Sequence, residues 1–425
     1  MSGLKAEVDP AEVGLDADRL RRIDGNFARY VDDGRLAGYL VTVARHGKLA
    51  HVSSYGARDR EEGLPVESDT LWRIFSMTKP ITSVAAMMLQ EEGALQLTDP
   101  VSKFIPSFAD LRVYAGGSDQ NPLTVPATEP MRVWHLLTHT SGLTYGFHRV
   151  HTVDAIYRAA GFDPGAPRGM DLAAACDGWA SLPLLFEPGA EWNYGVSTDV
   201  LGRVVEVASG QSLDEFFAER IFGPLGMKDT GFFVPSDKAR RLAACYSASP
   251  QGAMTFHATD RKGGLTLQDD PATSSFLSPP SFISGGGGLC STAADYLTFC
   301  RALLNGGELG GVRLIGPKTL ALMTANHLPG GRTLPELSRS LFSEATYHGI
   351  GFGLGFSVTL DPAKTLIPGS AGEYAWGGAA TTSFWIDPAE ELITIFMTQL
   401  VPSSSYPIRR ELRTMVYAAI TDSNI

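Results

Sequence analysis

Ser76 and Lys79 lie three positions apart in the segment FSMTKP, at the predicted start of a helix. Residues i and i+3 share one helix face, with Cβ atoms about 5 to 6 Å apart. The amine of Lys79 can therefore reach the hydroxyl of Ser76 and activate it as a nucleophile. The alternative is a helix-capping serine beside a solvated lysine. The same spacing at Ser2 and Lys5 shows that the motif alone does not decide between them.

The surroundings of Ser76 favour the catalytic interpretation. An apolar segment, residues 71–75, precedes it, whereas Ser2 and Lys5 lie in a polar stretch. Apolar residues then recur at helical spacing up to a terminating glycine, namely Ile81, Val84, Ala85, Met88, Leu89 and Gly93. Ser76 is therefore expected at the buried end of a helix.

Two later segments could complete such a site. Tyr194, in EWNYGVS, is predicted to lie in a turn just before a helix, where its phenol can face a cleft. Trp376, Gly377 and Gly378, in YAWGGA, precede a predicted strand, and glycines there let a backbone N–H approach a bound ligand. The first segment offers a second base, and the second offers half of an oxyanion hole.

The composition predicts a globular protein without a basic surface. The chain has 425 residues, 44% of them hydrophobic, and a net charge of −11 with scattered lysines. Binding to nucleic acid or to an anionic membrane is therefore not expected. The first thirty residues contain no apolar secretory segment, and no run approaches the roughly 20 apolar residues of a membrane-spanning helix. The four cysteines form no C-x-x-C pair, so a cytoplasmic protein with reduced thiols is expected.

The hydrophobic pattern at the two chain ends is similar. Residues 20–30 predict a helix, followed by strands at 38–45 and 48–53. Strands at 381–387 and 391–399 precede a last helix over 408–420. Both ends are expected to share one antiparallel sheet. The middle is mainly helical, with capping boxes at Ser212 and Thr292, and the Ser-, Pro- and Gly-rich residues 247–288 predict a long functional loop.

In this order, the segments resemble the serine β-lactamase and penicillin-recognising superfamily. The resemblance is to its class C β-lactamase and DD-peptidase branch, and most of all to the family VIII carboxylesterases. Further supporting segments are HLLTHTSGL at 135–143, PLGM at 224–227, GGGGLCST at 285–292 and GFGLGF at 351–356. The resemblance implies an α+β fold whose antiparallel sheet is flanked by N- and C-terminal helices. Residues 1–75 and 289–425 would form this α/β domain, and residues 76–288 an inserted, mainly helical domain.

The resemblance also assigns roles within the site. Ser76 would be the acylated nucleophile, with Lys79 and Tyr194 as general base and acid, and the backbone N–H groups of Ser76 and Ala379 would hold the oxyanion. A tyrosine phenol has an ordinary pKa of about 10, and a neighbouring ammonium lowers such a pKa by about 1 to 3 units. Whether Tyr194 or Lys79 is the principal base stays open, because the two groups titrate as a coupled pair.

Departures from the β-lactamase pattern bear on the substrate. Trp376, Gly377 and Gly378 stand where class C enzymes have Lys-Thr-Gly, so a charged hydrogen bond to a substrate carboxylate is replaced by an apolar wall. Val196 stands at the asparagine position of the Tyr-x-Asn motif. Both changes favour a neutral ester over a penicillin or a D-Ala-D-Ala peptide, and we expect this ester to have a short chain. The predicted pocket also includes Tyr145, Phe147 and His148.

The remaining motifs do not indicate a further functional site. The glycines of residues 285–288 do not complete G-x-G-x-x-G and predict tight turns. His135 and His139 are spaced as in a zinc helix but have no obvious third ligand, so no metal and no cofactor are expected. The chain has no G-x-S-x-G motif, which argues against an α/β-hydrolase.

The sequence thus predicts a serine carboxylesterase that works through an acyl-enzyme on Ser76, with a small-molecule ester as its partner. Three alternatives stay open. They are acyl transfer to a small alcohol, β-lactam or D-amino-acid peptide hydrolysis, and ligand binding without turnover. The oligomeric state is not predicted.

Overall fold

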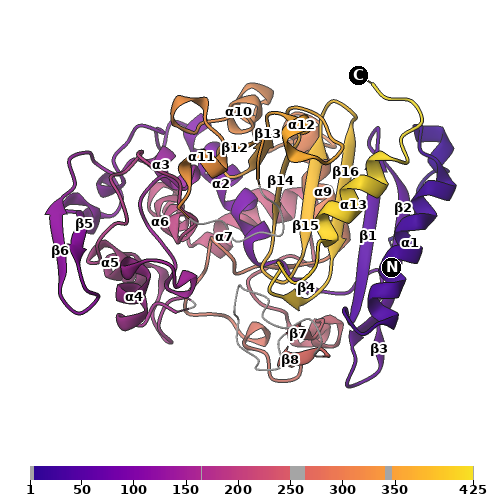
Figure 1. The fold of residues 1–425 in the computed structure, drawn as a ribbon, viewed down its shortest axis with the longest axis horizontal. Coiled ribbons are helices and arrows are strands. Elements are labelled where there is room, and N and C mark those ends of the chain that lie inside the picture. Colours follow the sequence, from indigo (N-terminus) through magenta and orange to yellow (C-terminus); the bar gives the residue numbers. More distant parts are fainter. Residues whose placement is uncertain (1–3, 164, 249–263, 340–346, 425) are drawn as a thin grey trace.

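An antiparallel sheet of eight strands organises the computed structural model, which describes residues 4–163, 165–248, 264–339 and 347–424 (Figure 1). The strands lie side by side in the order β12-β13-β14-β15-β16-β1-β2-β3. Their bounds are β12 Ile350–Phe352, β13 Ser357–Thr359, β14 Tyr374–Gly377, β15 Ser383–Asp387, β16 Leu392–Met397, β1 Gly38–Arg45, β2 Lys48–Asp59 and β3 Leu64–Pro65. The expected α+β fold and the sharing of one sheet by both chain ends are confirmed.

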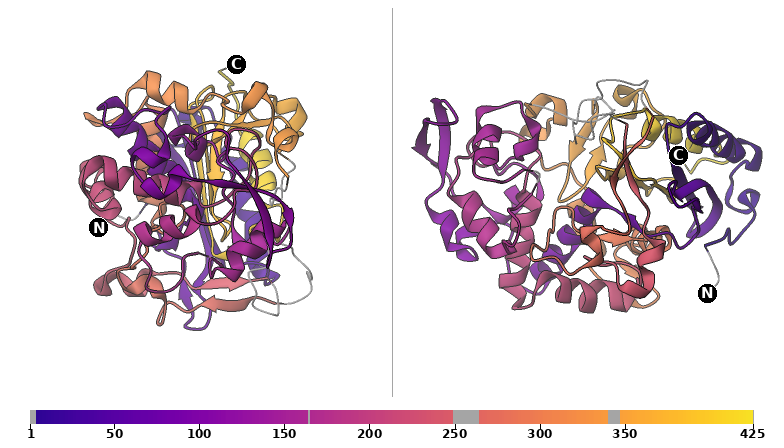
Figure 2. Two further views of the ribbon diagram at one scale, coloured as in Figure 1. Left: turned by 90° about the vertical axis from the view of Figure 1, so that its left-hand side faces the viewer. Right: turned by 90° about the horizontal axis from the view of Figure 1, so that it is seen from below.

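Helices cover both faces of this sheet, as the two views in Figure 2 show. On one face α1 (Ala17–Asp32) and α13 (Ile408–Tyr417) pack side by side. The predicted apolar stripe of α1, including Phe27, is fully buried there against residues such as Phe396. On the other face, α9 (Ala293–Leu304) packs on β15 and β16. The sheet is therefore packed against helices on both of its faces.

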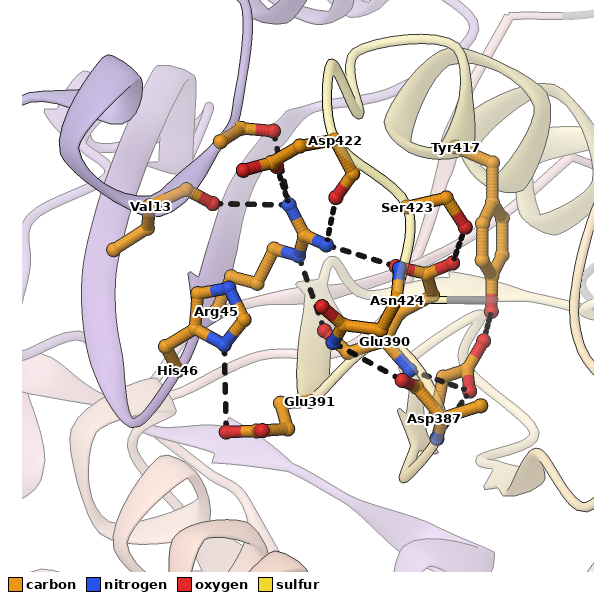
Figure 3. A network of polar contacts seen from close by, with 12 residues as sticks. Val13, Arg45, His46, Asp387, Glu390, Glu391, Tyr417, Asp422, Ser423 and Asn424 are labelled. Carbon is orange, nitrogen blue, oxygen red and sulfur yellow. Dashed lines mark hydrogen bonds and ion pairs between the residues drawn. The ribbon is translucent and has the colours of Figure 1, made fainter.

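Arg45, at the end of β1, joins the two ends of the chain (Figure 3). Its fully buried guanidinium lies 2.8 Å from the carboxylate of Glu390 and 2.7 Å from that of Asp422. It also donates hydrogen bonds to the carbonyl oxygens of Val13 and Gly14, at 3.1 and 3.0 Å. One side chain thus satisfies acceptors from both termini.

The mainly helical part of the chain lies to the left of the sheet in Figure 1. Its central pair is α2 (Thr78–Glu91) and α6 (Ser197–Ser209), which pack against each other. Around them lie α3 Val133–Leu137, α4 Thr152–Ala159, α5 Leu172–Ala180, α7 Leu213–Phe217, α8 Gly223–Leu225 and the hairpin of β5 Arg112–Gly117 and β6 Pro122–Pro126. The proposed domain boundaries at residues 75/76 and 288/289 stay a prediction.

Smaller elements connect these two regions. β4 (Trp72–Arg73) pairs with β9 (Cys290–Ser291), so the chain before Ser76 is tied to the segment that follows the glycine run. The remaining elements are β7 Cys245–Ser247, β8 Thr266–Asp269, β10 Glu308–Leu309, β11 Val312–Arg313, β17 Leu400–Val401, α10 Pro317–Met323, α11 Leu334–Leu337 and α12 Pro362–Thr365. Of the predicted functional loop at 247–288, residues 249–263 lie outside the described residues.

Several predicted element boundaries differ from the structure, and two of these differences lie at the candidate site. The helix after Ser76 begins at Thr78, and Ser76 itself lies in a 3₁₀ turn over Phe75–Met77. The strand expected from residue 381 begins at Ser383, because Thr381 has a left-handed φ of 69° in the turn after Gly378. Both differences place tight turns at the ends of elements that meet in the candidate site.

Candidate active site

The turn that carries Ser76 has an unusual backbone conformation. Phe75 has a φ of +42°, in the left-handed region that costs a residue with a Cβ about 1 to 3 kcal/mol. The turn is held from the other side, because the amide of Ile74 donates to the carbonyl of Leu289 at 3.0 Å. The surrounding structure thus holds Ser76 in a fixed, partly buried position between β4 and α2.

Lys79 lies on the first turn of α2 and is 1% exposed. Its Nζ lies 3.2 Å from Oγ of Ser76, 3.2 Å from the hydroxyl of Tyr145 and 2.7 Å from the carbonyl oxygen of Gly286. An ammonium group has three N–H donors and no acceptor, so these three oxygens can each receive one. The side chain is therefore fixed next to Ser76.

Tyr194 reaches Ser76 from the opposite side. Its hydroxyl lies 2.6 Å from Oγ of Ser76, and Nζ of Lys79 lies 4.5 Å from the centre of its ring. The tyrosine precedes α6, and its carbonyl oxygen lies 2.7 Å from Nε2 of His148. The ring of His139 packs 5.0 Å from the tyrosine ring. Oγ of Ser76 thus lies within hydrogen-bond distance of both Lys79 and Tyr194.

The end of β14 approaches the Ser76 turn closely. A Cβ at Gly378 would lie 2.5 Å from the carbonyl oxygen of Ile74, so only glycine fits there. Arg409 donates to the carbonyls of Gly378 and Thr382, at 2.9 and 3.0 Å, which fixes the turn from outside. Ala379, whose backbone N–H is the predicted oxyanion donor, lines the same cavity as Ser76. An oxyanion hole would require the N–H groups of Ser76 and Ala379 to point to one position, and this role stays a prediction.

Ser76 opens onto a cavity of about 280 Å³ with mostly apolar walls. The predicted residues that line it are Ser76, Tyr145, Phe147, Tyr194, Val196, Trp376, Gly377, Gly378 and Ala379. Aromatic walls that the sequence did not indicate come from Trp179, Trp192, Phe282 and Tyr347. His148, predicted for the pocket, is instead buried behind Tyr194 and does not line the cavity.

Burial fixes the charge of several neighbours. It lowers the pKa of His139 well below the ordinary 6.5, and the nearby Lys79 adds to this effect. Burial also lowers the pKa of His148 to about 4. The pKa of Tyr145 rises well above 10, first by burial and then by the charges of Asp199 and Tyr194. Around neutral pH, Tyr145 is therefore a neutral phenol and both histidines are neutral imidazoles.

The family model described as Beta-lactamase matches residues 23–418 of this chain. The chain belongs to the Beta-lactamase family. An uncharacterised protein of Mycobacterium tuberculosis is 38% identical over 90% of this chain and 91% of its own length. Esterase EstB of Burkholderia gladioli is 33% identical over 97% of this chain and 99% of its own length. The solved structure of EstCE1, described as a hydrolase with promiscuous acyltransferase activity, is similar to this fold, with a TM-score of 0.76 and 28% sequence identity. The match covers 94% of this chain and 98% of the EstCE1 chain.

The sequence of this Beta-lactamase family member did not reveal the role of the glycine run at 285–288. Residues 285–287 form the predicted turn, closed by a hydrogen bond from the amide of Gly288 to the carbonyl of Ser284 at 3.0 Å, but none of the four glycines has a positive φ. A Cβ at Gly286 would lie 2.5 Å from Oδ2 of Asp199, a buried residue on the first turn of α6. The glycine is thus needed for a close approach between two segments, and Asp199 lacked any motif that would have indicated it.

No group of three or more His, Cys, Asp or Glu side chains is arranged to hold a metal ion within the described ranges. His135 instead accepts a hydrogen bond from the amide of Arg132 at 3.0 Å, through Nδ1. In the same part of the chain, no helix has the length and apolarity required to cross a bilayer.

Proposed function

We propose that this protein is a serine carboxylesterase that hydrolyses neutral, short-chain esters through an acyl-enzyme on Ser76. The observation that carries the proposal is the position of Oγ of Ser76, within 3.2 Å of Nζ of Lys79 and 2.6 Å of the hydroxyl of Tyr194, at an apolar cavity. The name of EstB and the description of EstCE1 support esterase chemistry on this scaffold.

In the first half-reaction, Oγ of Ser76 attacks the ester carbonyl carbon while its proton passes to the Lys79 and Tyr194 pair. The backbone N–H groups of Ser76 and Ala379 stabilise the negative charge on the carbonyl oxygen. The pair then returns the proton to the departing alcohol. In the second half-reaction, the same pair takes a proton from water, which attacks the acyl carbon. The bond to Oγ of Ser76 then breaks, the pair returns the proton to Oγ, and the acid leaves.

The walls of the cavity support a neutral substrate. Trp376 lies 5.5 Å from the ring of Tyr194 and 5.2 Å from that of Phe352, so an aromatic surface occupies the position of the class C lysine. Val196 adds a further apolar contact surface. A substrate carboxylate would lose its hydration there without gaining a cation from residue 376. We also propose a cytoplasmic location, which the four buried, unpaired cysteines support.

Acyl transfer to a small alcohol is the second candidate. The aromatic walls formed by Phe147, Trp179 and Phe282 favour an apolar acceptor over water near the acyl-enzyme. The description of EstCE1 shows that one structural relative combines both activities. Adding a primary alcohol to the esterase assay distinguishes the two, because acyl transfer yields a new ester in place of the free acid.

The substrate preference can be tested with paired assays of purified protein. We expect kcat/KM for 4-nitrophenyl acetate or butyrate to exceed that for a chromogenic cephalosporin by at least about 100-fold, equivalent to 2.7 kcal/mol. A Trp376→Lys variant should narrow this ratio, since it restores a cation at that wall. Equal or greater activity of the wild-type protein on the cephalosporin would contradict the proposal.

A further inference from the structure

Asp199 is a buried carboxylate close to the predicted catalytic groups, and no step described above uses it. It is 3% exposed, and its Oδ1 accepts hydrogen bonds from Oγ of Ser284 at 2.5 Å and from the amide of Gly286 at 3.0 Å. The carbonyl of the same Gly286 accepts from Nζ of Lys79 at 2.7 Å. One glycine residue therefore bridges a buried carboxylate and a buried lysine.

The buried lysine requires a compensating negative charge. Among the described ion pairs, none joins Lys79 to a carboxylate, although the lysine is almost completely buried. A buried ammonium group is costly unless charge and hydrogen bonds compensate it. Asp199 interacts electrostatically with Lys79, and this interaction opposes the rise that burial causes in the pKa of Asp199. The two charges thus stabilise each other across the Gly286 peptide.

The other titratable groups around this pair do not supply that charge. Tyr145 faces Lys79 from the loop after α3, and Tyr194 and His139 pack beside it. Cys176 of α5 faces Asp199, and burial raises the pKa of its thiol well above 9. Arg203 and Glu206, further along α6, pair with each other at 2.9 Å. Since Tyr145, His139 and Cys176 are neutral around pH 7, Asp199 is the anion nearest to Lys79 that the described contacts provide.

We propose that Asp199 is a positioning residue that holds the Gly286 carbonyl on Lys79 and acts as the buried counter-charge of this lysine. Lys79 then donates to Oγ of Ser76, and Tyr194, whose hydroxyl lies 2.6 Å from the same oxygen, receives the serine proton. This inference rests on the proposed function, because it assigns a role within the same site.

The charge of Asp199 and its hydrogen bonds can be separated by substitution. Asp199→Asn removes the charge but keeps an oxygen acceptor for Ser284 and Gly286, whereas Asp199→Ala removes both. Asp199→Ser removes the charge with a smaller side chain, and replaces the asparagine variant if that variant does not fold. Glu206→Gln is the matched control, because it removes one negative charge from the same helix near Arg203.

The readouts are kcat/KM for 4-nitrophenyl butyrate and the rate of covalent labelling by a fluorophosphonate, each measured against pH. A buried negative charge favours the protonated form of the site, so its removal should move the acid limb of both profiles to lower pH by about 1 unit. Glu206→Gln should keep the wild-type pH profile. Asp199→Ala should show the same shift of the acid limb and should also have a lower rate at every pH. The labelling rate measures activation of Ser76 whatever the natural substrate is. If the ester proposal fails, turnover of the ester is absent while labelling still reports the effect of Asp199, so the two failures can be told apart. An acid limb that stays in place in Asp199→Asn, or in Asp199→Ser where the asparagine variant does not fold, would overturn the inference, with or without a lower rate.

Discussion

The hydroxyl of Tyr194 lies 2.6 Å from Oγ of Ser76, although 118 positions separate the two residues in the chain. Ser76 comes from the turn between β4 and α2, and Tyr194 from the loop before α6. Because α2 and α6 pack against each other, the fold itself sets this distance. The site is thus assembled by helix packing and does not depend on a local sequence motif.

Tyr194→Phe should lower kcat for ester hydrolysis by about 10² to 10⁴, since general acid and base catalysis contributes that much. The ring and its packing against His139 and Trp376 would be retained. Steady-state kinetics on 4-nitrophenyl butyrate measures the effect. Tyr374→Phe is the control, because its buried hydroxyl has no hydrogen-bond partner among the described residues and lies outside the cavity. A decrease below threefold for Tyr194→Phe would leave Lys79 as the only base.

Tyr145→Phe should reduce kcat about 10-fold. The substitution removes one of the three oxygens that surround Nζ of Lys79, and a hydrogen bond to a charged group is worth about 1.5 to 3 kcal/mol. The aromatic ring, which stacks on Phe147 with centroids 4.6 Å apart, would keep the cavity wall intact. KM should therefore change little, and the loss should appear in kcat. A change confined to KM would indicate that Tyr145 acts only as a wall of the pocket.

The sequence indicated the residues with reactive side chains but not the residues that position them. Ser76, Lys79 and Tyr194 were indicated by residue type, spacing and resemblance, and the structure brings them together. Asp199 and Gly286 were missed, because their relationship depends on the packing of a loop against α6. The amphipathic helices at both chain ends were visible from their apolar periodicity, which directly reflects burial. His148 was predicted in the pocket but is buried, with Nε2 2.7 Å from the carbonyl oxygen of Tyr194, since spacing does not show which side of a loop faces a cavity.

Acidification should destabilise the folded protein between pH 6.5 and about 4. Burial lowers the pKa of His135 and of His148 from the ordinary 6.5 to about 4. In this range the unfolded state binds protons that the folded state does not, so stability falls as pH falls. Each histidine contributes roughly 3 kcal/mol at most, at 1.36 kcal/mol per pKa unit. Chemical denaturation across this range measures the free energy of unfolding at each pH. In His148→Gln this free energy should fall less steeply as the pH falls, by a slope equivalent to about one proton. An unchanged slope would contradict the buried, neutral state of His148.

Arg45→Met should lower the free energy of unfolding by about 3 to 5 kcal/mol, because it leaves Glu390 as a buried charge without its partner. The double variant with Glu390→Gln should regain part of this loss. Arg313→Met, which breaks the exposed pair with Glu308, is the control and should change stability by less than about 1 kcal/mol. Denaturant titration measures all three. Equal effects of Arg45→Met and Arg313→Met would show that the network in Figure 3 contributes little to stability.

The most direct test of the central claim is mass spectrometry of the protein after brief exposure to a fluorophosphonate. The wild-type protein should gain one adduct, and peptide mapping should locate it on Ser76. The Ser76→Ala variant, with the same fold verified by circular dichroism, should gain none and should lose nearly all ester turnover. Labelling of Ser76→Ala at the wild-type rate would contradict the assignment of Ser76 as the nucleophile.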